Sequence, residues 1–245
     1  MKQPIHNPFI LALKARNLTV EIHHHSAYQI VLSNDSPFNS TISGVLHEGI
    51  HGFLIKPQVT HFCVAENGTL NVLNIEPYST IGLELAGRFE GDQEYIVFDT
   101  PPEANSFFQT TNDTFDINKV IDALLFKVPS IAYDERVTKI VEYIKANYFQ
   151  SAITPQTFAD IVFLSPSRLA ALFKQQTGSS LSKYLLWTRL RQAIYLILSE
   201  KDRSLTDIAY DTGFYDLPQF NKYMYEMFGM PPKALKYNSD LIEIY

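Results

Sequence analysis

The feature that most constrains this chain is an internal repeat in its second half. Two segments share the same apolar spacing, first at an offset of 50 residues and then, after one extra turn residue, at an offset of 51. The first pairing aligns Phe158-Ala159-x3-Phe163 with Ile208-Ala209-x3-Gly213, and the second aligns Leu169, Phe173 and Gly178 with Phe220, Met224 and Gly229. Each copy has the pattern of a short helix, a tight turn and a second helix, which is typical of a helix-turn-helix motif. A helical bundle with an accidental repeat is the alternative.

Helix-capping residues mark the second helix of each copy. Ser165-Pro166 supplies an N-cap and a proline in the first turn, and Gly178 ends the predicted helix over 166–176. Asp216-Leu217-Pro218 and Gly229 do the same for a helix over 217–227. The amphipathic stretch between the copies, 180–200, would span about 30 Å as a helix, close to the roughly 34 Å of one turn of B-DNA. The spacing therefore predicts two helices that enter successive major grooves.

The first half of the chain has the pattern of short strands. Residues 18–99 hold β-branched and aromatic runs separated by turn signals, which predicts a sandwich or barrel. The expected strands are 28–33, 41–46, 52–55, 61–65, 70–75 and 94–98, with Asn67-Gly68 as a hairpin turn. Residues 115–128 carry an apolar stripe of helical period, which either packs on its own domain or forms a dimer seam. Pro129 ends that helix.

These patterns predict a two-domain chain. Residues 1–130 form an all-β barrel with a helical extension, and residues 131–245 form an all-α domain of two helix-turn-helix motifs joined by a long helix. The single Cys63 excludes a disulfide framework and a cysteine-rich zinc site. Without a signal peptide or an apolar run of about 18 residues, we expect a cytosolic protein with no membrane contact. The net charge is −7 over 1–130 and +1 over 131–245, so the helical half is not strongly basic.

Residues 134–237 resemble the DNA-binding domain of the AraC/XylS family of bacterial transcription regulators. The motifs that carry the resemblance are Leu164-Ser165-Pro166-Ser167-Arg168-Leu169, Leu172-Phe173-Lys174, Thr177-Gly178, Arg189-Leu190-Arg191-Gln192-Ala193, Asp207-Ile208-Ala209, Thr212-Gly213-Phe214 and Phe228-Gly229-x-Pro231-Pro232. The resemblance implies that the second helix of each motif lies in a major groove.

The resemblance also assigns candidate DNA contacts. On the first reading helix they are Ser167, Arg168, Ala170, Ala171 and Lys174, and on the second Pro218, Gln219, Asn221 and Lys222. Asn221 or Gln219 could pair with adenine through both amide atoms, and Lys222 with guanine or a phosphate. The sequence departs from the family at Glu226, where basic residues are usual. A carboxylate there would repel phosphates, so we expect weak non-specific binding.

The first half resembles a cupin barrel, the usual effector-binding domain of this regulator family. The matching segments are His23-His24-His25 with Tyr28-Gln29-Ile30-Val31-Leu32, and the run 52–61 that ends in His61. A cupin enzyme would hold a metal with His23, His25, a glutamate and His61, but Gln29 stands where that glutamate would be. We therefore expect His23, His25, Gln29 and His61 to bind an organic effector, with no metal, cofactor or catalytic residue. Barrel histidines without a ligand role are the alternative.

The resemblance implies a ligand-responsive transcription regulator. Its expected partners are promoter or operator DNA, a small-molecule effector, a second copy of the chain and RNA polymerase. Two other readings stay open: a metal-dependent cupin enzyme with a helical appendage, and a regulator whose barrel only dimerises.

Overall fold

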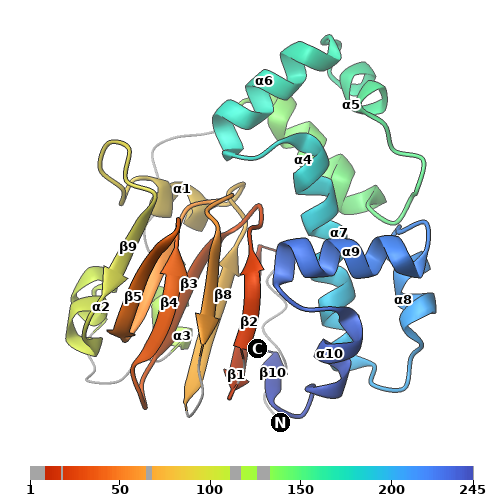
Figure 1. The fold of residues 1–245 in the computed structure, drawn as a ribbon. Helices are drawn as coiled ribbons and strands as arrows, with labels where there is room; N and C mark the ends of the chain where they lie inside the picture. The colour runs from red at the N-terminus through yellow and green to blue at the C-terminus, as the bar shows by residue number, and fades with distance from the viewer. Residues whose placement is uncertain (1–8, 18, 65–67, 111–116, 126–132, 245) are drawn as a thin grey trace. The chain divides into compact units, whose positions relative to one another are not determined.

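The computed structural model describes residues 9–17, 19–64, 68–110, 117–125 and 133–244. These residues form two compact units (Figure 1). One unit consists of the residues before 131 together with those from 240 onward, and the other consists of residues 131–239. The chain therefore returns to the first unit after it has completed the second.

The first unit is built from two antiparallel sheets. Within the described residues, one sheet has the order β10-β1-β8-β3-β6-β9 and the other the order β2-β7-β4-β5. The strands are β1 (Ile10–Arg16), β2 (Thr19–His23), β3 (Tyr28–Ser33), β4 (Phe38–Ile42), β5 (Val45–Ile50), β6 (Gly52–Ile55), β7 (His61–Val64), β8 (Thr69–Ile75), β9 (Tyr95–Phe98) and β10 (Ile242–Ile244).

The larger sheet is buried on both faces. Successive side chains of a strand point to opposite sides, so each strand contributes to two separate clusters. On β3, Val31 packs into the core between the two sheets, which also contains Phe53 and Cys63. Its neighbours Ile30 and Leu32 face the opposite side, where three helices cover the sheet. These helices are α1 (Thr80–Ala86), α2 (Pro101–Phe108) and α3 (Ile117–Leu125).

The apolar stripe of α3 packs on its own unit. Val120, Ile121 and Leu124 are buried in one cluster with residues of α1, α2 and the larger sheet. Val128, the last residue of the predicted stripe, lies outside the described residues. Val120, Ile121 and Leu124 are therefore core and are not available as a dimer seam.

Two details of the strand prediction are wrong. The predicted strand over 41–46 is interrupted by a tight turn at Ser43 and Gly44, which have φ of 51° and 81° and separate β4 from β5. The turn at Asn67-Gly68 lies partly outside the described residues, but the strands on either side of it pair in different sheets. They therefore do not form a hairpin.

The second unit is helical. It contains α4 (Glu135–Asn147), α5 (Pro155–Ile161), α6 (Pro166–Thr177), α7 (Leu181–Ser199), α8 (Leu205–Asp211), α9 (Leu217–Phe228) and α10 (Pro232–Tyr237). The central helix α7 buries Tyr184, Trp187, Leu190 and Ala193 against the others. No helix in the described part of the chain is long and apolar enough to cross a membrane.

Candidate nucleic-acid interface and histidine site

The first helix-turn-helix motif consists of α5 and α6. The hydroxyl of Ser165 accepts a hydrogen bond from the backbone N–H of Arg168 and caps α6, which ends at Gly178 in the left-handed conformation. Leu169 and Phe173 are fully buried and hold the helix on its unit. The predicted contact residues all lie exposed on the other side; they are Ser167, Arg168, Ala170, Ala171 and Lys174.

The second motif consists of α8 and α9 and has the same construction. Asp216 caps α9 by accepting from the backbone N–H of Gln219 at 2.7 Å. Pro218, Asn221 and Lys222 are exposed, as expected for groove contacts. Gln219 is half-buried, and its amide oxygen accepts from the backbone N–H of Tyr215 at 2.9 Å. Because pairing with adenine needs both amide atoms, Asn221 is the better placed of the two amides.

The turns of the two motifs use the same backbone conformation with different residues. Phe163 in the first turn has φ of 54°, and Gly213 in the second has φ of 87°. A left-handed conformation is unusual for a bulky residue. Phe163 accommodates it with a side chain that is 95% exposed. Gly213 has no such room, because a Cβ there would lie 2.6 Å from the carbonyl oxygen of Tyr148.

Arg189 of α7 explains the crowding at Gly213. Its guanidinium donates to the carbonyl oxygens of Tyr148 and Gln150, both at 2.7 Å. Burial lowers the pKa of this guanidinium. The sequence did not distinguish this role from a solvated one. Arg189 therefore connects the end of α4 to the central helix and acts as a structural residue of the helical unit.

Lys222 is the single cation in the sequence of α9. Lys222 lies 3.9 Å from the Glu226 carboxylate, in an exposed pair one helical turn apart. Lys236 donates to the carbonyl oxygen of Arg203 at 2.6 Å and is half-buried. The positive charge of α9 is thus partly offset by its own carboxylate, which fits the weak phosphate binding expected from the sequence.

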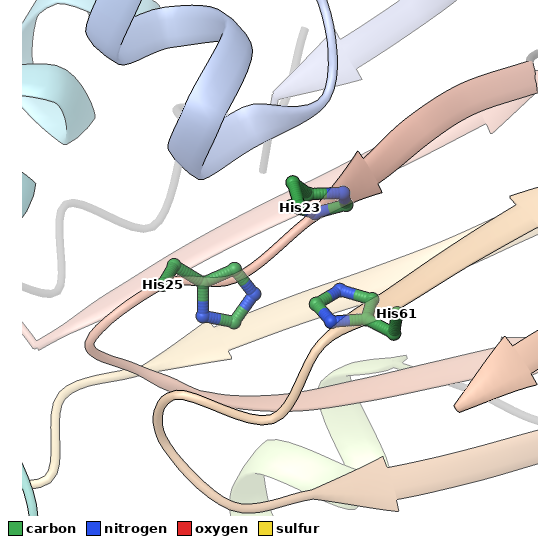
Figure 2. Close-up of side chains that lie close together, drawn as sticks. All are labelled: His23, His25 and His61. Carbon is green, nitrogen blue, oxygen red and sulfur yellow. The ribbon is translucent and has the colours of Figure 1, made fainter. Parts of the chain in front are cut away.

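Three of the four predicted effector residues converge in the first unit (Figure 2). His23 ends β2, His61 begins β7, and His25 lies in the segment between β2 and β3. His23 and His61 are paired across the two strands next to an irregularity in the register. The ring centroids are 4.2 Å apart for His23 and His61, 5.1 Å for His25 and His61 and 5.8 Å for His23 and His25.

Each ring of this histidine cluster is held by a backbone carbonyl. The Nδ1 atoms of His23, His25 and His61 lie 2.8, 3.1 and 3.0 Å from the carbonyl oxygens of Glu21, Ala27 and Val59. A carbonyl oxygen can only accept, so in His23 and His61 Nδ1 carries the proton and Nε2 keeps a lone pair. The Nδ1 atom of His25 also lies 3.4 Å from the backbone nitrogen of Ala27, whose N–H can donate to it. Burial lowers the pKa of His23 to about 4, and lowers the pKa of His25 and His61 well below the usual range. All three rings are therefore neutral at pH 7.

Gln29 comes from the other sheet. It belongs to β3 in the larger sheet, where it is paired with Asn74 of β8. Its amide nitrogen donates to the Asn74 side-chain oxygen at 3.0 Å.

Comparisons with known proteins agree with this architecture. Residues 158–237 match the family model of a helix-turn-helix domain. Across 227 residues the chain is 24% identical to the probable transcriptional regulator LumQ of Photobacterium leiognathi, covering 88% of this chain and 91% of LumQ. It is 32% identical to the transcriptional activator RhaS of Enterobacter sp. (strain 638), over 44% of this chain but only 38% of RhaS.

Among solved structures, ToxT of Vibrio cholerae has the same fold. Its unsaturated-fatty-acid-bound form superposes with a TM-score of 0.60 at 14% identity and covers 97% of both chains. The repeated motifs and this fold define a two-domain protein with a double helix-turn-helix unit. In sequence the chain is similar to these transcriptional regulators and activators, and its C-terminal unit carries a helix-turn-helix domain.

Proposed function

We propose that this chain is a transcription regulator of the AraC/XylS family that binds a specific promoter or operator site through α6 and α9, under the control of an effector bound in the barrel. The observation that carries the proposal is the matched pair of reading helices. Each begins at a side-chain cap, is anchored by two fully buried side chains and presents exposed positions in its first two turns. Side chains in those turns are the ones that reach base edges in this type of motif.

The two helices would contribute differently. Exposed Asn221 and Lys222 on α9 offer hydrogen bonds that distinguish bases. The Ala170 and Ala171 methyl groups of α6 offer apolar contact only, for example to a thymine methyl. Arg168 and Lys174 lie beside them and would hold phosphates. Sequence recognition should therefore be stronger in the half-site that α9 contacts.

Selection from a pool of random duplexes at a stated salt concentration tests this proposal. We expect enrichment of a site with two base clusters about one helical turn apart. Asn221→Ala should relax one cluster only, by about 1–3 kcal/mol of discrimination. Lys222→Ala should also relax one cluster only, and Lys139→Ala, at an exposed position of α4, is its control. Equal loss in both clusters with Asn221→Ala, or no enrichment by the folded protein with and without effector, would contradict the proposal.

The effector, the dimer and the polymerase contact belong to the same proposal. The ToxT structure compared above holds a bound unsaturated fatty acid, so a related fold holds an organic ligand. We propose that the barrel of this chain takes a small effector at the histidine cluster, that two copies associate, and that the bound regulator contacts RNA polymerase. Light scattering with and without operator DNA measures the association.

The histidine cluster also favours the alternative of a metal-dependent cupin enzyme. The relatives compared above are named as regulators and activators, which supports regulation over catalysis. We therefore propose that the cluster serves ligand binding. Turnover of a substrate by the purified chain, lost in His61→Gln, would favour the enzyme.

A further inference from the structure

We propose that His23, His25 and His61 together bind one divalent transition-metal ion, and that this ion is the signal to which the regulator responds. The first part depends only on the histidine cluster. The second part rests on the proposed function, because it requires the chain to bind DNA.

The three side chains already lie within reach of a single ion. One potential ligand atom from each of the three histidines lies within 4.8 Å of the others. Three nitrogens at about 2.0–2.1 Å from a tetrahedral zinc ion lie roughly 3.4 Å apart. Each pair therefore needs to approach by about 1.4 Å or less, which small side-chain rotations can supply.

The orientation of the rings provides a second, independent observation. His23 and His61 point Nδ1 at a backbone carbonyl oxygen, so Nε2 is the atom of each ring that can bind a metal. Metal-binding histidines are held in this way, with the second ring nitrogen donating to a carbonyl or carboxylate. His61 is fully buried, and its Nε2 atom has no hydrogen-bond partner among the described residues. A buried acceptor of this kind needs an explanation, and a coordinated ion supplies one.

The donor set selects the class of ion. The cluster contains three imidazoles and neither a carboxylate nor a thiolate. Imidazole nitrogen suits Zn²⁺, Ni²⁺, Co²⁺ and Fe²⁺, whereas Mg²⁺ and Ca²⁺ prefer oxygen ligands. Three protein ligands leave a fourth tetrahedral position for water or for a donor atom of a small molecule. Gln29 replaces the glutamate of a metal-binding cupin, but this does not prevent binding, because Zn²⁺ held by three histidines requires no anionic ligand.

The position of the cluster gives the ion a means to affect the barrel. His23 and His61 belong to adjacent strands of the smaller sheet, and the segment that carries His25 leads into β3 of the larger sheet. A bound ion would thus link the two sheets at one end of β3. It can shift the regulator between states only if it binds one of them more tightly.

Metal titration of the full-length protein, after dialysis against a chelator, tests the binding part. We expect one equivalent of Zn²⁺ to bind, and Co²⁺ to give the visible absorption of a low-coordinate nitrogen site. His61→Gln should weaken binding by at least about 100-fold, since changes to outer-shell partners alone reduce metal affinity about 10–100-fold. His47→Gln is the matched control, because His47 lies on β5 outside the cluster. His23→Gln is the second variant if His61→Gln fails to fold.

The outcomes separate the two parts. Absence of saturable one-to-one binding, or binding that survives both His61→Gln and His23→Gln, overturns the site. For regulation, we expect Zn²⁺ to change the affinity for the selected operator at least tenfold in the native protein and the His47→Gln variant, but not in His61→Gln. A bound ion that leaves operator affinity unchanged overturns the signalling part. A chain that binds Zn²⁺ but selects no duplex would instead contradict the proposed DNA-binding function.

Discussion

The two turn residues of the helical unit, Phe163 and Gly213, allow a direct test of the packing described here. Gly213→Ala should lower the free energy of unfolding of this unit by about 3–5 kcal/mol. About 1–2 kcal/mol comes from placing a Cβ in the left-handed region. The rest comes from the 2.6 Å approach of that Cβ to the Tyr148 carbonyl oxygen. That oxygen accepts from Arg189, and a hydrogen bond to a charged group contributes about 1.5–3 kcal/mol.

The equivalent position in the first motif supplies the control. Phe163 already has a left-handed backbone, and its side chain is almost fully exposed. Phe163→Ala therefore removes no buried contact and adds no strain, so the free energy of unfolding should change by less than about 1 kcal/mol.

The single tryptophan makes the measurement specific to the helical unit. Trp187 lies fully buried in α7, so its fluorescence follows unfolding of this unit in urea. With a slope of about 1–3 kcal/mol per molar urea, the midpoint of Gly213→Ala should fall by roughly 2 M. If the two alanine variants unfold at the same urea concentration, the close approach to Tyr148 is not what requires glycine. If Gly213→Ala lowers the free energy of unfolding by only about 1–2 kcal/mol, backbone strain alone accounts for the loss. The predicted clash with the Tyr148 carbonyl oxygen would then be refuted.

Three further predictions concern the cluster, the caps and the charges. Because the pKa of buried His23 is about 4 in the fold and 6.5 when exposed, the stability of the metal-free barrel should fall as the pH drops below 6.5, with about 3 kcal/mol lost by pH 4 through His23 alone. The depressed pKa values of His25 and His61 add to this loss. Circular dichroism of the chelated protein at pH 7 and 5 checks this, and equal stability at both would contradict neutral buried rings. Asp216→Ala should cost about 1 kcal/mol in the Trp187 urea transition while Asp216→Asn costs little, and similar losses in both would exclude the cap. Glu226→Gln should raise non-specific DNA affinity a few-fold with a steeper salt dependence, and an unchanged salt slope would show that α9 lies away from phosphates.

The helical unit was predictable because its signals are local. Ser165, Asp216, Gly178 and Gly229 each act within one helical turn, and all four occupy the caps expected from the sequence. The same argument fails at the turn between β4 and β5. Both central residues there have positive φ, but Ser43 does not belong to the Asn-Gly or Asp-Gly pairs that usually mark such turns.

The barrel was less predictable because strand partners are not encoded locally. Strand pairing places Gln29 opposite Asn74 in the larger sheet, and the residues next to Gln29 in sequence do not indicate that partner. The strands β1 and β10 were not predicted either. They are separated by more than 220 residues in sequence, and β10 follows a helical domain. Convergence of His23, His25 and His61 was expected from the cupin resemblance, whereas the carbonyl contacts that orient the rings were not.

The pairing of β10 with β1 has a consequence for how the protein is made. Ile242–Ile244 pair with the edge of β1, and they are synthesised after the whole helical unit. At about 5–20 residues per second, the ribosome needs on the order of ten seconds between the end of α3 and β10. During that interval the β1 edge of the nascent barrel has unpaired backbone groups of the kind that promote aggregation. A premature stop codon just before residue 242 would thus damage the first domain of the chain while leaving the last helix of the second one complete.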